Sequence, residues 1–206
     1  MHKELLSALA IALTLVAFVP YLRSVHVGRT KPHIFSWIIW GLATLIIFMA
    51  QLADGGGAGA WPIGVSAIGS FYVAGLAYAR GADRTITRTD WIFFITALAS
   101  IPLWYLTENP LGAVIILTVI DVLGFGPTFR KTYIRPHEER ITLFAIVAGR
   151  NLISIAALEN YTLVTVLFPA VLSAICLIFI SMVFLRRRYI RLKDITPAQG
   201  TGKHIH

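Results

Sequence analysis

The sequence predicts an all-α integral membrane protein of seven transmembrane helices, arranged as two parallel three-helix repeats joined by a linker helix. The composition is the first observation that predicts this fold class. Hydrophobic residues make up 57% of the 206 residues and charged residues only 14%, with a mean hydropathy of +0.74. A soluble domain of this length could not bury so much apolar surface. The long apolar runs and an internal repeat are the other two observations.

Seven apolar runs approach the length of about 20 residues that a helix needs to cross roughly 30 Å of hydrocarbon. In chain order they cover 4–22, 34–52, 60–79, 91–107, 110–129, 141–158 and 161–185. We expect helices, because lipid offers no partner to unpaired backbone groups and the runs are too long for barrel strands. The first run has no small-residue cleavage site, so we interpret it as a retained span. Cys176 is the only cysteine and can form no internal disulfide.

The charge distribution predicts the orientation of the chain. The net charge is +8, and nearly all of the 18 Lys and Arg residues fall in segments 23–33, 80–90 and 130–140 and in the tail from 186 onward. The positive-inside rule therefore places the N-terminus outside and the C-terminus in the cytoplasm, which requires an odd number of spans. We expect a multi-pass protein of a plasma membrane, such as the bacterial inner membrane. Its basic loops and tail would contact anionic lipid, so the charge requires no nucleic-acid partner.

An internal repeat organises the spans. The stretch "PIGVSAI" at 62–68 returns as "PAVLSAI" at 169–175, and residues 18–80 align with 125–187 without gaps. The identical pairs include prolines, arginines and a serine: Pro20 with Pro127, Arg23 with Arg130, Pro62 with Pro169, Ser66 with Ser173, and Arg80 with Arg187. Because each unit has three helices, one linker helix is needed to bring both units to the same orientation. We therefore expect a first repeat over 1–80, a linker with the fourth helix over 81–109, a second repeat over 110–188 and a basic cytoplasmic tail over 189–206.

This 3 + 1 + 3 plan resembles the SWEET sugar transporters and the wider PQ-loop superfamily. The stretch "PYLRSVHVGRTKPHIFSWIIW" at 20–40 looks like the first-helix proline, basic loop and second helix of that family, and "PTFRK" at 127–131 takes the equivalent place in the second unit. "WPIG" at 61–64 is also similar to the nicotinamide riboside transporters, which share the plan. The resemblance implies a membrane transporter of a small polar solute, either a facilitator or proton-coupled. The alternative is a non-transporting receptor or scaffold, because retrieval receptors that bind a peptide tail share the fold.

The resemblance also implies where a substrate would bind. The pocket asparagines of SWEET proteins on spans three and seven correspond to Ser66 and Ser173 here. The serine and tryptophan of span two correspond to Ser36 and Trp40, one helical turn apart on one face. Leu143 and Val147 take the matching positions of span six.

Two charged residues lie within predicted spans, where ionisable groups are costly. Arg150 falls near the midplane of the sixth span and Asp121 within the fifth. One interpretation is an ion pair that holds the second unit together. The other is that Arg150 recognises an anionic group of the substrate, with Asp121 as its alternate partner or as a proton carrier, a role that the resemblance favours. Snorkelling of Arg150 is a third reading, and the neighbouring Asn151 either bonds to another helix or lines a cavity.

The remaining expectations concern hinges and excluded activities. Four prolines are candidate gates or hinges, unless packing fixes a local kink: Pro20, Pro62, Pro127 and Pro169. We expect Trp37 in an interfacial belt, and "DGGGAGA" at 54–60 as a flexible outer turn, not a phosphate cradle. Because no Ser-His-Asp set, zinc motif or carboxylate dyad stands out, we expect no enzyme, cofactor or metal site. A homo-oligomer is compatible with the sequence.

Overall fold

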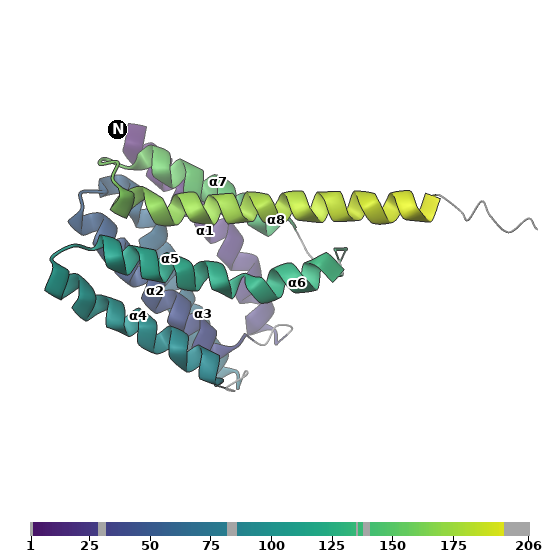
Figure 1. Cartoon of the computed structure of the whole chain (residues 1–206), viewed down its shortest axis with the longest axis horizontal. Helices are drawn as coiled ribbons and strands as arrows, with labels where there is room; N and C mark the ends of the chain where they lie inside the picture. Colours follow the sequence, from purple (N-terminus) through teal and green to yellow (C-terminus); the bar gives the residue numbers. More distant parts are fainter. Residues whose placement is uncertain (1, 29–31, 82–85, 135, 138–140, 196–206) are drawn as a thin grey trace, which may run out of the picture.

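The computed structural model describes residues 2–28, 32–81, 86–134, 136–137 and 141–195, and these residues contain helices and no strand (Figure 1). Each long helix coincides with a predicted apolar run. The elements are α1 (His2–His26), α2 (Ile34–Ala53), η1 (Gly57–Ala60), α3 (Trp61–Ala79), α4 (Arg88–Thr107), α5 (Leu111–Gly124), α6 (Gly126–Ile134), α7 (Ile141–Ala157) and α8 (Leu163–Ile195).

Within the described ranges, five helical segments are long and apolar enough to cross a membrane: 2–26, 34–53, 57–79, 88–107 and 163–191. The apolar helices α5 and α7 are shorter. Large apolar side chains project from the bundle surface, among them Ile68 at 70% exposure and Leu106 at 78%. A monomeric soluble protein rarely exposes so many. The structure is therefore compatible with a multi-pass helical membrane protein.

The expected fifth span, 110–129, is not one continuous helix. It divides into α5 and α6 at Phe125, whose amide donates to the carbonyl of Val122 (3.1 Å). Pro127 explains the break, because proline has no N–H to bond the fourth preceding carbonyl and its ring crowds that carbonyl. Its repeat counterpart Pro20 lies inside the continuous helix α1.

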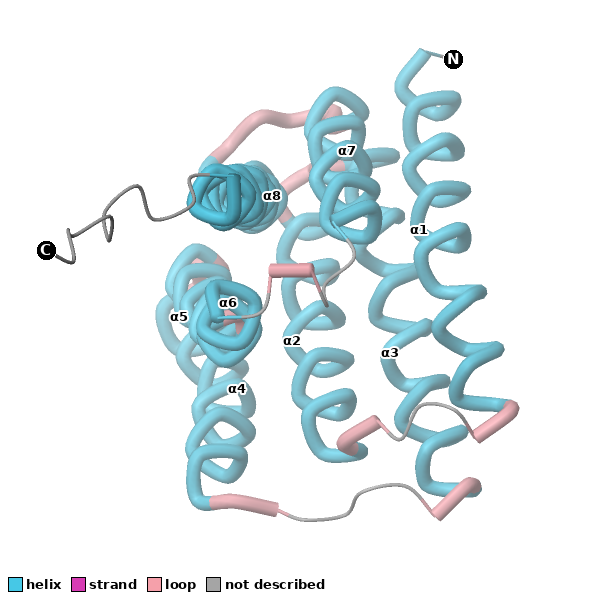
Figure 2. Tube along the Cα trace, turned by 90° about the vertical axis from the view of Figure 1, so that its right-hand side faces the viewer, coloured by secondary structure: helices cyan, strands magenta, loops and turns pink. Residues whose placement is uncertain are grey.

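The helices pack in a way that interleaves the two halves of the chain. Helix α2 lies against α3, and α7 against α8, while α1 contacts both α3 and α7. Helix α5 contacts α8 and α2, and α4 lies at the edge of the bundle against α5 and α2 (Figure 2). The core sits where α2, α5 and α8 meet, around Ile47, Leu117 and Phe168.

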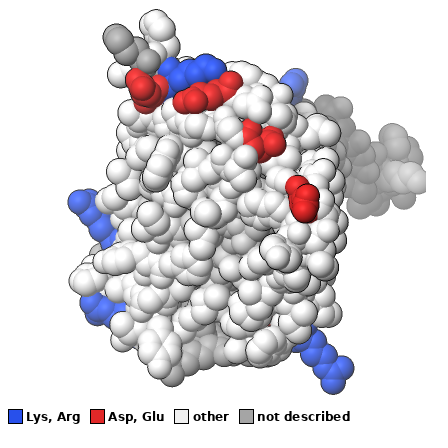
Figure 3. All heavy atoms as spheres, turned by 90° about the vertical axis from the view of Figure 1, so that its left-hand side faces the viewer, with Lys and Arg blue, Asp and Glu red and all other residues white. Residues whose placement is uncertain are grey.

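The bundle has two ends that differ in charge. We call the end that holds the start of α1 and the segments 53–61, 107–111 and 157–163 the N-terminal end, and the other the far end. Seen from the N-terminal end, the surface is mainly uncharged and its acidic groups lie in the upper part (Figure 3). Helix α8 has 33 residues, or roughly 50 Å at 1.5 Å per residue, and projects past the far end of the bundle (Figure 1).

Candidate functional site

A cavity of about 650 Å³ lies between α1, α2, α7 and α8. Six aromatic side chains line it, and we call it the aromatic cavity; they are Phe18, Tyr21, Trp37, Trp40, Phe125 and Phe144. The lining also includes the loop residues Pro32 and His33, so the cavity reaches the far end of the bundle.

The aromatic rings of the cavity contact one another and form its walls. Trp37 is central: its ring centre lies 5.1 Å from that of Tyr21, 5.3 Å from that of Trp40 and 6.2 Å from that of Phe18. The Trp37 and Trp40 rings are perpendicular, an arrangement that aromatic pairs favour. Such rings offer flat apolar faces to a ligand at little entropic cost. The structure therefore gives Trp37 a place in the cavity wall, where the sequence suggested an interfacial belt.

The predicted pair Ser36 and Trp40 both line the cavity, on one face of α2. The Ser36 hydroxyl lies 2.7 Å from Nδ1 of His33, and the backbone N–H of Ser36 donates to the same nitrogen (3.3 Å). His33 thereby caps the start of α2. Leu143 and Val147 lie in the opposite wall, on α7. The polar groups of the cavity thus lie toward the far end.

Arg150 is buried, with 6% of its surface exposed, in a cluster apart from the cavity lining. Its Nη1 donates to the Ser66 hydroxyl (2.6 Å) and to the carbonyl of Pro62 (3.2 Å), and its Nη2 donates to Oδ1 of Asn151 (2.8 Å). We call these four residues the arginine cluster. It joins α7 to the first turns of α3.

The arginine cluster does not contain the predicted ion pair. Arg150 and Asp121 attract each other electrostatically, but no hydrogen bond or ion pair joins them in the described part of the chain. Asp121 is partly buried on α5, one turn before the cavity residue Phe125. Val147, three residues before Arg150 on α7, lines the cavity, as does Cys176 on α8. The two charges therefore lie close to the inner end of the cavity without meeting.

Buried polar atoms without a hydrogen-bond partner among the described residues include Nε of Arg150 and Nδ2 of Asn151 in the arginine cluster, and Oε1 of Gln51 in the last turn of α2. Leaving such an atom unpaired costs about 1–3 kcal/mol. The Gln51 side chain is held by its Nε2, which donates to the carbonyl of Thr165 (2.6 Å). The unpaired atoms leave donors and an acceptor for water or a small polar molecule.

The two serines that the repeat pairs have different surroundings. Ser66 accepts from Arg150 and donates to the carbonyl of Pro62 (3.0 Å). Ser173 donates to the carbonyl of Ala148 (3.2 Å) and so ties α8 to α7. Neither serine lines the aromatic cavity. Of the four residues that the resemblance assigns to a substrate site, Ser36 and Trp40 line this cavity, and Ser66 and Ser173 lie elsewhere.

The glycine-rich segment 54–60 is not the flexible turn that the sequence suggested, because it is bonded to residues 158–162. Glu159 accepts from the amide of Ala58 (3.3 Å) and donates from its own amide to the carbonyl of Gly56 (3.1 Å). Two further bonds join the same two segments: Asn160 Nδ2 donates to the Asp54 carbonyl (2.9 Å), and the Thr162 hydroxyl donates to the Asp54 carboxylate. Lys3 of α1 also donates its Nζ to the Leu158 carbonyl (2.6 Å). We call this junction the interlock. It joins the connection after α2 to the connection after α7 at the N-terminal end of the bundle.

The four candidate hinge prolines occupy different settings. Pro20 is exposed within α1, and Pro169 is buried within α8. Pro62 lies in the first turn of α3, where its missing N–H costs nothing. Pro127 is the second residue of α6, directly after the break at Phe125. Its side chain is outside the described part of the structure. Pro62 and Pro127 each lie in the first turn of a helix, whereas Pro20 and Pro169 lie inside continuous helices.

Several residues that line the cavity were not predicted from the sequence as site residues. Phe18, Tyr21, Phe125 and Phe144 look like ordinary core or lipid-facing residues within apolar helices. One signal was available in the spacing, because Phe18 and Tyr21 on α1 lie three residues apart, as do Trp37 and Trp40 on α2. Residues at that spacing share a helix face. Two aromatic faces on neighbouring helices would have suggested a common wall.

The described residues contain no group of three or more His, Cys, Asp or Glu side chains that could hold a metal ion. Comparisons with protein-family models, with curated proteins and with solved structures find no match.

Proposed function

We propose that this chain is a membrane transporter of a small polar metabolite, which works by alternating access between two three-helix repeats. The observation that carries the proposal is the pairing of a cavity that reaches one end of the bundle with an interlock that closes the other. A path across a membrane must be closed on at least one side at any moment. A cavity open toward one end, above a hydrogen-bonded closure, is the arrangement that this requirement predicts.

The helix contacts support two equivalent units. Within the first half α3 contacts both α1 and α2, and within the second half α8 contacts both α5 and α7. Across the halves, α1 lies against α7 and α2 lies against α5. The repeat pairs α1 with α5–α6, α2 with α7, and α3 with α8. Under this pairing the contact of α1 with α7 is equivalent to the contact of α5 with α2. A twofold axis along the membrane normal would produce this pattern.

The orientation follows from the positive-inside rule. We propose seven crossings, with α5 and α6 together forming the fifth, which puts the N-terminal end outside and the far end in the cytoplasm. The aromatic cavity then opens to the cytoplasm, and the interlock closes the outer side. In this proposal the structure corresponds to an inward-facing state.

The cavity favours a solute with a flat face and a few polar groups. Trp37 and Trp40 offer stacking surfaces, and the hydroxyl of Ser36 lies in the lining near the mouth. A volume of about 650 Å³ falls within the range of roughly 300–1,000 Å³ that small-molecule sites have. Asp121, beyond the inner end of the cavity, is the candidate proton carrier for a coupled cycle, and no residue that the structure describes donates a hydrogen bond to it.

Uptake by proteoliposomes tests the proposal. Labelled sugars, amino acids, organic acids and nucleosides are offered to the purified protein, and we expect saturable uptake of one class, reduced by Trp40→Ala.

A disulfide across the interlock can hold its two segments together in the same assay. A Cβ built at Gly55 would lie 3.6 Å from Cβ of Asn160, within the range of about 3.5–4.5 Å that disulfides require.

We expect the oxidised Gly55→Cys/Asn160→Cys variant to lose uptake and to regain it on reduction. Each single variant is the matched control, because it carries the same local change without the crosslink and should not respond to oxidant. Uptake that persists in the crosslinked protein would contradict a cycle in which the interlock opens. Solute binding without uptake, in folded protein, would instead favour the receptor alternative.

A further inference from the structure

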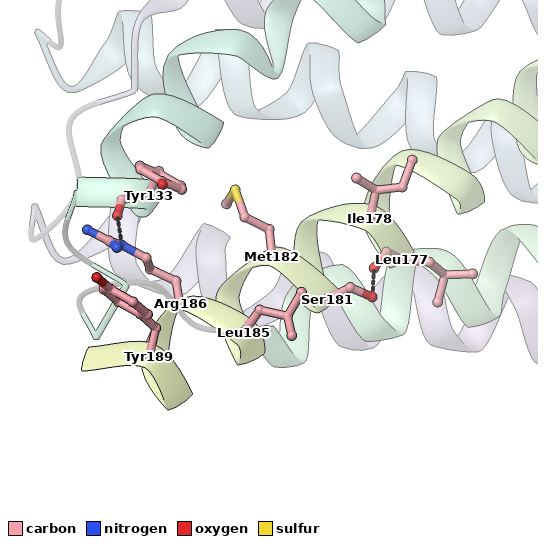
Figure 4. Close-up of a pocket in the computed structure, with 8 residues that line it drawn as sticks. All are labelled: Tyr133, Leu177, Ile178, Ser181, Met182, Leu185, Arg186 and Tyr189. Carbon is pink, nitrogen blue, oxygen red and sulfur yellow. Dashed lines mark hydrogen bonds between the residues drawn. The ribbon is translucent and has the colours of Figure 1, made fainter. Parts of the chain in front are cut away.

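A second hollow, of about 740 Å³, lies on the outside of the bundle between α6 and α8. Figure 4 shows its side chains in two groups, and all of them except Tyr133 of α6 lie on α8. The apolar group is Leu177, Ile178, Met182 and Leu185, and the other group is Tyr133, Arg186 and Tyr189. We call this hollow the α6–α8 groove. It shares no residue with the aromatic cavity.

The apolar part of the groove offers no free hydrogen-bonding group. Ser181 lies beside the apolar group, and its hydroxyl donates to the carbonyl of Leu177 in its own helix (2.8 Å). Ile178 and Leu185 are 60% and 67% exposed. From 177 to 185 the groove follows α8 for roughly 12 Å at 1.5 Å per residue. It therefore presents a dry strip suited to a hydrocarbon chain.

The other end of the groove holds a fixed guanidinium. Nε of Arg186 donates to the carbonyl of Tyr133 (3.1 Å), and its Cζ lies 4.6 Å from the centre of the Tyr133 ring and 5.4 Å from that of Tyr189. These contacts hold the side chain in place (Figure 4). The two terminal nitrogens donate to no acceptor among the residues that the structure describes. A planar fork of N–H groups fits phosphate oxygens in a bidentate fashion.

We propose that the α6–α8 groove binds one anionic phospholipid, with an acyl chain along residues 177–185 and the phosphate on Arg186. The dimensions agree, since half of a hydrocarbon core of about 30 Å is roughly 15 Å. The position agrees as well, because the apolar run of α8 ends at Leu185 and the arginines 186–188 follow at once.

The charge of the groove favours an anionic headgroup over a zwitterionic one. Arg187 and Arg188 adjoin Arg186, and none of the described residues that line the groove is acidic. The positive choline or ethanolamine group of a zwitterionic headgroup would be repelled by these arginines. An anionic headgroup such as glycerol phosphate has no positive group and avoids that repulsion. Each basic residue near a membrane surface attracts anionic lipid by about 1 kcal/mol. The tail that follows α8 is a poor occupant for the same reason, because it carries Lys203 and no acidic residue after Asp194.

Native mass spectrometry of the detergent-solubilised protein tests this proposal. The probes are phosphatidylglycerol and phosphatidylcholine with identical acyl chains, each titrated into delipidated protein. We expect one phosphatidylglycerol to bind with about fivefold preference over phosphatidylcholine. Arg186→Gln should abolish that preference, and the matched control Arg88→Gln, at the start of α4, should keep it. Met182→Trp, which fills the apolar strip, should weaken both lipids, and thermal unfolding confirms that each variant is folded.

Equal binding of the two lipids, or an unchanged preference in Arg186→Gln, would overturn the proposal. A dimer that forms without lipid and dissociates in Met182→Trp would overturn it too, because a second copy would then cover the groove. The result does not depend on transport, since lipid binding and solute uptake are measured separately.

Discussion

Replacing Gly59 by alanine perturbs the interlock directly. A Cβ at Gly59 would lie 2.5 Å from the backbone nitrogen of Leu158 and 2.7 Å from the carbonyl oxygen of Ser154. Both atoms belong to the main chain at the end of α7, so no side-chain rotation can relieve the clash. Segment 57–60 must therefore move away from α7.

The expected loss of stability follows from this overlap. Overpacking a tight contact costs about 1–3 kcal/mol, and each kcal/mol lowers Tm by about 2–4 °C in a chain of this size. We therefore expect Gly59→Ala to lower Tm by roughly 2–12 °C. The matched control is Gly75→Ala, in the middle of α3, where a Cβ meets no atom within 4 Å. There alanine should stabilise by about 0.5–1 kcal/mol, because glycine is the poorer helix former.

Thermal unfolding of both variants in one detergent measures the two shifts, which should have opposite signs. A second measurement is the reaction of a maleimide with a cysteine at position 160, introduced into the wild-type and the Gly59→Ala backgrounds. The loosened interlock should raise the labelling rate. If Gly59→Ala and Gly75→Ala shift Tm equally and labelling does not change, the segments at the N-terminal end do not pack as described.

Two further predictions concern the charged groups within the bundle. Arg150→Lys keeps the charge but cannot reach Ser66, Pro62 and Asn151 together, so we expect a loss of about 1–3 kcal/mol; thermal unfolding against the exposed control Arg188→Lys measures it, and equal shifts would contradict the hydrogen bonds of the arginine cluster. Asp121→Asn cannot carry a proton, so uptake driven by an inward proton gradient should fall to the rate without a gradient. Counterflow of labelled solute, which needs no gradient, should persist, and a variant still driven by the gradient would exclude Asp121 as the carrier.

The helical architecture could be predicted because its cause is local. A run of apolar residues long enough to cross hydrocarbon has few alternatives to a helix, and the positions of α2, α3 and α4 follow from their runs. The same-face argument for Ser36 and Trp40 also needs only the helical period. The division between α5 and α6 was within reach, since Pro127 is visible in the sequence, but Pro20 lies in a continuous helix. A proline alone therefore does not indicate which of the two helices will break.

The interlock and the aromatic cavity depend on contacts between distant segments, which the sequence does not display. A glycine-rich loop predicts flexibility when it is considered alone. Gly59 is needed because Leu158, nearly a hundred residues later, lies against it. Phe144 likewise lies in an apolar stretch of sequence that looks the same whether its side chain lines a cavity, fills a core or faces lipid. For Arg150 the sequence indicated burial and a need for partners, but the hydrogen-bond partners are neutral groups of α3 and α7 and not the carboxylate of Asp121.

The projection of α8 beyond the far end has a practical consequence for imaging. A chain of 22.7 kDa whose long helices lie mostly side by side offers few features outside a detergent micelle by which single particles can be aligned. Helix α8 continues past the bundle to Ile195, on the side away from the interlock. Extending it in register into the first helix of a larger carrier protein would transmit its orientation rigidly to a visible mass. Such a fusion would leave the aromatic cavity and the N-terminal end unmodified, so the open and closed forms of both could be compared directly.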